Sequence, residues 1–125
     1  MKIWVDADAC PNIIKNVIYK VSQRRGVKVI LVANQFMRIP ESKLFRFIQV
    51  GKGFNEADEK IVELLDKTDL VITADIPMAS DVIGKGAVAL NPRGEMYTTD
   101  NIRARLSMRD FMDTLRMGGT ITDGA

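Results

Sequence analysis

The 125-residue chain contains no histidine. This absence excludes Ser-His-Asp and Cys-His catalysis, and also zinc sites with imidazole ligands. The single cysteine, Cys10, cannot form a disulfide within the chain, which fits a reducing compartment. Chemistry at neutral pH would therefore depend on carboxylates, a lysine, one thiol or a bound metal. With many aspartates and no imidazole, that metal would be a hard cation, Mg²⁺ or Mn²⁺.

Long hydrophobic runs are missing too. No apolar segment approaches the roughly 20 residues of a membrane span, and the start lacks the pattern of a signal peptide. We therefore expect a cytoplasmic protein that does not contact membranes. The net charge of +2 is too small for nucleic-acid binding by charge alone. The length predicts one domain over residues 1–125, with a flexible tail over about 117–125.

Apolar and amphipathic segments alternate along the chain. The apolar runs predict strands at residues 2–5, 27–33, 47–50, 70–73 and 87–90. Helical spacing predicts helices at 11–25, 55–67, 76–86 and about 99–116, and residues 38–45 form a loop or short helix. Apolar strands alternating with helices indicate an α/β fold, a three-layer sandwich whose five-stranded parallel sheet is covered on both faces.

Carboxylates gather where the predicted strands end. Asp6 and Asp8 follow the first strand, and Asp75 follows the fourth. Ligands bind such sheets at the carboxyl edge, where the strand order reverses. If the order is 3-2-1-4-5, these three aspartates share one crevice. Asp58 in the first turn of its helix and Asp81 in the next segment would lie near the same edge.

Two interpretations of these aspartates stay open. Each one alone fits a helix cap, and Asp8 lies just before a helix that Pro11 opens. As a set, converging carboxylates would repel one another, so a cation would neutralise them. Two metal ions held there would support hydrolysis of phosphodiester bonds.

Three blocks carry a resemblance to a known family: "IWVDADACP", "DLVITADIPMA" and "GAVALNPRGEMY". They resemble the YaiI/YqxD family of bacterial proteins, which is grouped with PIN-like domains. The resemblance implies the strand order 3-2-1-4-5 and the activity of a metal-dependent ribonuclease. It implies the strand-one acid at Asp6 with Asp8 beside it, the helix acid at Asp58, the strand-four acid at Asp75, and a further ligand at Asp81.

The leading interpretation is a PIN-like nuclease that uses Mg²⁺ or Mn²⁺ and acts on RNA rather than DNA. Asp6, Asp8 and Asp75 would hold metal, while Asp58 and Asp81 would complete the catalytic set. The candidate substrate-binding residues, all polar or basic, are Asn12, Asn34, Thr73, Ser80, Lys85, Asn91 and Arg93. Two alternatives stay open: a haloacid-dehalogenase-like phosphatase with Asp6 as its nucleophile, and a non-catalytic module that binds RNA or protein. The sequence also leaves a homo-oligomer open.

Overall fold

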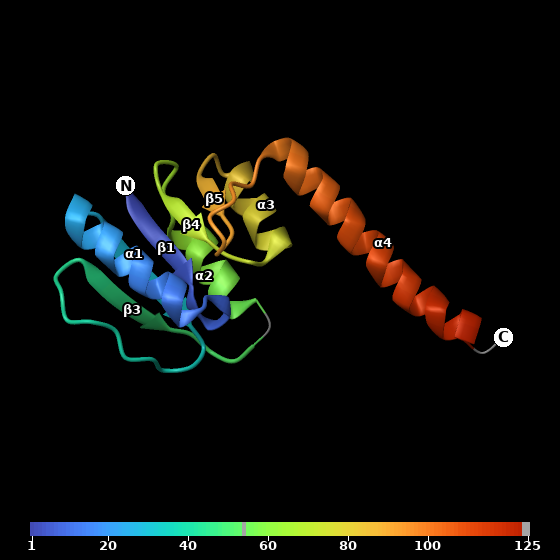
Figure 1. The fold of residues 1–125 in the computed structure, drawn as a ribbon, viewed down its shortest axis with the longest axis horizontal. Helices are drawn as coiled ribbons and strands as arrows, with labels where there is room; N and C mark the ends of the chain where they lie inside the picture. Colours follow the sequence, from blue (N-terminus) through green and yellow to red (C-terminus); the bar gives the residue numbers. More distant parts are fainter. Residues whose placement is uncertain (54, 124–125) are drawn as a thin grey trace.

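A parallel sheet forms the centre of the fold (Figure 1). The structure, a computed structural model, describes residues 1–53 and 55–123. Within them the sheet has five strands in the order β3-β2-β1-β4-β5, each pair parallel. The strands are β1 (Lys2–Asp6), β2 (Lys28–Ala33), β3 (Phe45–Gln49), β4 (Leu70–Ile72) and β5 (Val88–Leu90). The expected α/β fold and strand order, with the first strand central, are confirmed.

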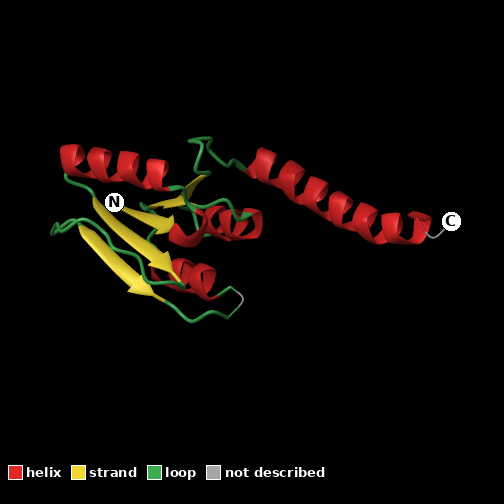
Figure 2. Ribbon diagram, turned by 60° about the horizontal axis from the view of Figure 1, so that its bottom comes forward, coloured by secondary structure: helices red, strands yellow, loops and turns green. Residues whose placement is uncertain are grey.

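Helices cover both faces of the sheet, as Figure 2 shows. Helix α1 (Asn12–Arg25) covers one face, and α2 (Glu56–Leu64) and α3 (Ile76–Gly84) cover the other. The alternation of side chains along β1 supplies both cores. Ile3 and Val5 pack on the α1 side, whereas Trp4 packs on the α2 and α3 side. This is the three-layer arrangement that continuous apolar strands predict.

Some element boundaries differ from the expected ones. Strand β3 begins at Phe45 rather than residue 47, and α2 ends at Leu64 rather than residue 67. Residues 38–42 form no helix, and a short 3-10 helix, η1 (Ala7–Ala9), follows β1 without a clear signal in the sequence. Gly26 ends α1 in the left-handed conformation, at φ 69°, which glycine adopts without steric cost.

Helix α4 (Thr99–Asp123) is longer than expected and projects away from the sheet (Figure 1). The flexible tail expected from residue 117 is helical as far as Asp123, and residues 124–125 lie outside the described residues. A glycine in a helix interior costs only about 1 kcal/mol, so the pair at 118–119 does not force an end. Ile102 near the start of α4 is buried in the same core as α3. Nowhere in residues 1–53 and 55–123 does a helix combine the length and hydropathy that crossing a membrane requires.

A buried carboxylate holds the amino-terminal ends of β1 and β4 together. Asp69, which is 1% exposed, accepts hydrogen bonds from the Lys2 backbone N–H at 2.9 Å and the Trp4 indole at 3.0 Å. It also accepts one from the Asp66 backbone N–H at 2.8 Å, and the Lys2 ammonium lies 3.5 Å away. Burial alone would raise the pKa of Asp69, but these hydrogen bonds and the Lys2 charge lower it overall. The folded state therefore favours the ionised form of Asp69.

We expect Asp69→Asn to destabilise the protein by about 1–3 kcal/mol at pH 7, because an amide cannot accept all three hydrogen bonds. Since the folded pKa lies below the ordinary value of 3.8, the stabilisation is present above that pH and is lost as the pH falls through the folded pKa. Urea unfolding of both proteins from pH 7 to pH 3 measures this. The control Asp66→Asn, at an exposed carboxylate, should change stability far less, and equal effects of the two substitutions would contradict the assignment.

Candidate active site

Four aspartates line one cavity at the carboxyl edge of the sheet. Asp6 ends β1, Asp8 lies in η1, and Asp75 follows β4, which pairs directly with β1. Asp58 reaches the same cavity from the first turn of α2. The cavity has a volume of about 310 Å³, and we call it the acidic cleft. The pairing of β1 with β4 is what places carboxylates from distant parts of the chain side by side.

Asp6 is the most deeply placed of these carboxylates, at 9% exposed. The Thr73 hydroxyl donates to Asp6 Oδ2 at 3.0 Å and accepts from the Asp75 backbone N–H at 3.0 Å. Burial raises the pKa of Asp6, the charges of Asp75 and Asp8 raise it further, and the Thr73 hydrogen bond opposes them. Thr73 itself is 1% exposed, so it orients Asp6 rather than presenting a surface to substrate.

The helix-capping interpretation applies to a different aspartate from the one expected. Asp8 caps no helix: Pro11 is the N-cap of α1, and no side chain bonds there. Asp8 instead accepts the backbone N–H of Asn34 at 2.7 Å, which ties η1 to the end of β2. Asp75 is the N-cap of α3 and accepts from the Met78 N–H at 2.9 Å. One oxygen of Asp75 is therefore committed to the helix, while the side chain still lines the cleft.

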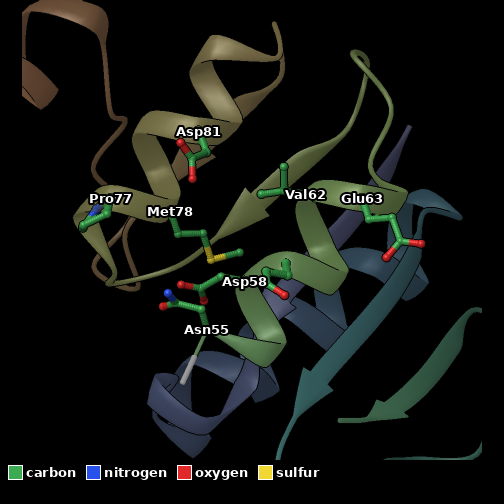
Figure 3. Close-up of a pocket in the computed structure, with 8 residues that line it drawn as sticks. Asn55, Asp58, Val62, Glu63, Pro77, Met78 and Asp81 are labelled. Atoms are coloured by element: carbon green, nitrogen blue, oxygen red, sulfur yellow. The ribbon is translucent and has the colours of Figure 1, made fainter. Parts of the chain in front are cut away.

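Asp58 connects the acidic cleft to a second cavity, between α2 and α3. That groove, about 430 Å³, is lined by Asp58 and Asp81, and Figure 3 shows Met78 between them. The pKa of Asp58 is raised to about 6. Burial is the largest cause, and the charges of Asp75 and Asp6, a hydrogen bond with Asp75 and the charge of Asp81 add to it. Asp81 is thus near Asp58 but lines the neighbouring groove rather than the acidic cleft.

These five carboxylates form no ion pairs within the part of the chain that the structure describes. Among the described residues that line the acidic cleft, only Lys52, between Gly51 and Gly53, is basic. Within the described ranges no three acidic or cysteine side chains are already arranged to hold one ion. Holding a cation would therefore require the carboxylates to turn toward one another.

The other candidate residues are divided between several places. Asn34 lines the acidic cleft, but Asn12, Ser80 and Lys85 do not. Asn12 lines a cavity beside α1. The Lys85 ammonium donates to the Val62 carbonyl, which joins the end of α3 to α2.

Asn91 and Arg93 belong to a turn after β5. The Asn91 carboxamide accepts from the backbone N–H groups of Arg93 and Glu95, so it shapes the turn rather than facing the cleft. Sequence reasoning missed Tyr97 and Arg105, which line a cavity with Arg93. Nothing in their local sequence signals this, because long-range packing brings them together. Lys52 had a weak signal, a lysine between two glycines.

The raised pKa of Asp58 predicts a dependence of stability on pH. An acid whose pKa is higher in the folded state than in the unfolded state destabilises the fold when it is ionised. For Asp58 this loss of unfolding free energy develops between about pH 4 and pH 6. Asp58→Asn should stabilise the metal-free protein above pH 6, by no more than about 1 kcal/mol because solvent screens a partly exposed group. The gain should vanish below pH 4.

Thermal melts in chelator across this pH range measure the effect, and carboxylate NMR reports the Asp58 titration directly. Glu41→Gln removes a charge from an exposed loop and should show no such pH dependence. A midpoint near 4 for Asp58 would contradict the crowding of these carboxylates.

Comparison with known proteins places this chain among bacterial relatives. A family model described as "Uncharacterized BCR, YaiI/YqxD family" matches residues 4–125. A UPF0178 protein from Yersinia pestis (strain Pestoides F) is 60% identical over 124 residues, covering 99% of this chain and 82% of that protein. A UPF0178 protein from Yersinia pseudotuberculosis serotype O:1b (strain IP 31758) has the same identity and coverage. No solved structure matches the chain significantly. The chain therefore belongs to the YaiI/YqxD family.

Proposed function

We propose that this protein is a metal-dependent nuclease that hydrolyses phosphodiester bonds in RNA. The observation that carries the proposal is the uncompensated charge of the acidic cleft. Asp6, Asp8, Asp58 and Asp75 line one cavity, and none of them has an ion-pair partner in the described residues. A buried carboxylate without a counter-charge is unfavourable, and a divalent cation would remove that cost. The resemblance to PIN-like ribonucleases favours RNA as the polymer.

The donor atoms of the cleft suit Mg²⁺ or Mn²⁺. They are oxygens from carboxylates, the two carboxamides of Asn34 and Asn55, and backbone groups, and hard cations prefer such ligands. Asp6, Asp8 and Asp75 would hold the cation, with Asp8 and Asp75 each retaining one oxygen beyond those bonded to a backbone N–H. A bound divalent cation would polarise the phosphoryl group and provide a nucleophile at neutral pH.

The remaining residues would position substrate and protons. Thr73 holds the Asp6 carboxylate in place through its hydroxyl. Asp58 lines the same cleft from α2 and would hold or release a proton beside the bound cation. Asp81 contributes negative charge beside Asp58 from α3. Lys52 lines the same cleft and can meet a phosphate of the substrate.

The test is cleavage of short single-stranded RNA and DNA by the purified chain with Mg²⁺, with Mn²⁺ and with chelator. We expect RNA cleavage only with metal, and Asp6→Asn should lower the rate by about 100-fold or more, the scale of losing a group that acts directly on the transition state. Asp66→Asn removes an equal charge from an exposed site across the sheet and should leave the rate unchanged.

Two results would overturn the proposal. The first is cleavage that Asp6→Asn leaves unchanged, which would indicate a contaminating nuclease. The second is hydrolysis of small phosphate monoesters with no cleavage of any polynucleotide, which favours a phosphatase with Asp6 as nucleophile.

Metal binding can be measured without any activity. Mn²⁺ should raise the melting temperature of the wild-type protein, because a ligand that binds only the folded state stabilises it. Asp75→Asn should weaken this rise while preserving the cap of α3, since the amide oxygen can still accept the Met78 N–H. Asp100→Asn on exposed α4 serves as the control. An equal response to Mn²⁺ in all three proteins would argue against metal binding by the acidic cleft.

A further inference from the structure

Another cavity, different from the acidic cleft and from the groove between α2 and α3, is lined by the residues on either side of Asp75. It has a volume of about 390 Å³, and its polar lining comes from Asn91, Arg93, Tyr97 and Arg105. No acidic side chain is among its lining residues in the described part of the chain. We call it the arginine pocket. Its charge is thus opposite in sign to that of the acidic cleft.

The connection from β4 to α3 contributes residues to both cavities. Asp75 has an extended conformation, with φ −82° and ψ 112°. In extended backbone successive side chains point to opposite sides. Accordingly Ala74 and Ile76 line the arginine pocket, while Asp75 between them lines the acidic cleft. The two cavities therefore lie back to back, one residue apart along the chain.

A tight turn presents Arg93 to the pocket. The buried Asn91 side chain accepts the backbone N–H of Arg93 at 2.9 Å and that of Glu95 at 3.1 Å. The Gly94 N–H bonds the Asn91 carbonyl at 2.9 Å, and Gly94 has φ 91°, a conformation that glycine tolerates. The Arg93 guanidinium takes part in no ion pair in the described residues. The turn therefore presents an arginine side chain whose charge no described acidic group pairs with.

Arg105 forms a second, more constrained wall of the pocket. Its guanidinium pairs with Glu95 at 3.1 Å and lies 5.2 Å from the centre of the Tyr97 ring. The Tyr97 hydroxyl donates to the Thr73 carbonyl at 3.1 Å, so the ring is held against the strand end. The pKa of Tyr97 is raised overall: burial and the charges of Asp75 and Glu95 raise it, while the charges of Arg105 and Arg93 lower it. Both arginines and Asp75 are therefore close to the same ring.

The chemistry of the pocket fits a phosphate monoester. Guanidinium groups bind phosphate through paired hydrogen bonds. A terminal phosphate carries about −1.5 to −2 charges at pH 7, more than the single charge of a diester. Arg93 is free to neutralise one of these charges, and Arg105 shares its charge between Glu95 and the ligand. The small apolar side chains of Ala74 and Ile76 add no competing charge.

We propose that the arginine pocket binds the terminal phosphate of an RNA strand whose neighbouring phosphodiester bond lies in the acidic cleft. The role given to the acidic cleft rests on the proposed nuclease function, whereas the binding of a phosphorylated end does not. Because Ala74, Asp75 and Ile76 between them contribute to the lining of both cavities, a strand end held in the arginine pocket would lie beside the acidic cleft. The nuclease would then act from a phosphorylated end.

Binding in chelator tests the pocket without any cleavage. Fluorescence anisotropy compares three internally labelled RNA strands of one sequence, with a 5′-phosphate, a 3′-phosphate, or hydroxyls at both ends. We expect one phosphorylated end to bind roughly tenfold or more tightly than hydroxyl ends, the scale of a hydrogen bond to a charged group. Comparing the two phosphorylated strands identifies which end is recognised.

Arg93→Gln should abolish this preference while leaving the affinity for hydroxyl ends nearly unchanged. Arg103→Gln removes the same charge from an exposed position on α4 outside the pocket and should keep the preference. Circular dichroism checks that both variants fold. Equal binding of phosphorylated and hydroxyl ends by the wild type would overturn the proposal, and so would equal losses in the two variants, which indicate a general charge effect.

The two proposals fail separately. Asp6→Asn should lose cleavage and keep the preference for a phosphorylated end. A preference for a phosphorylated end without any cleavage would support phosphate binding by the arginine pocket and contradict the nuclease function. Cleavage without that preference would support the nuclease function and contradict phosphate binding by the pocket.

Discussion

The pairing of β1 with β4 is the constraint on which the rest of this structure depends. It is held at both ends by buried aspartates with opposite roles. At the amino-terminal end, Asp69 is fully bonded and its ionised form is favoured. At the carboxyl end, Asp6 accepts one hydroxyl hydrogen bond and has no ion-pair partner among the described residues, and burial disfavours its ionised form. The same residue type is therefore bonded in its charged form at one edge of the sheet and held with a raised pKa at the other.

Much of the fold could be predicted because its strands are simple. Val-, Ile- and Leu-rich runs without polar interruption require burial on both faces, and only parallel strands between helix layers provide it. The ends of elements were less predictable. The pair of glycines after residue 117 weakens a helix, yet α4 continues to Asp123. On α1, helical spacing marks Ile13, Val17 and Ile18 alike, but only Ile18 is buried, since the sheet decides which face is covered.

The site was predictable only where strand order determines it. Asp6 and Asp75 come together because their strands are neighbours, and a sequence pattern can carry that information. It was not predictable that Asp75, rather than Asp8, caps a helix. The sequence favours Asp8 as a cap because Pro11 follows it, but η1 intervenes and turns Asp8 toward the end of β2. The position of Tyr97 and Arg105 at a cavity was not predictable from local sequence. Tyr97 bonds a residue 24 positions away, and Arg105 bonds one 10 positions away.

The short connection from β4 to α3 has a consequence for how the protein can change. Each side chain there faces a different partner: Thr73 bonds Asp6, Asp75 faces the acidic cleft, and Ala74 and Ile76 face the arginines. Insertion or deletion of one residue here would displace Asp75 both from the acidic cleft and from the N-terminus of α3, which it caps. Substitutions in this segment alter one contact at a time, whereas a change in its length would alter the lining of both cavities together.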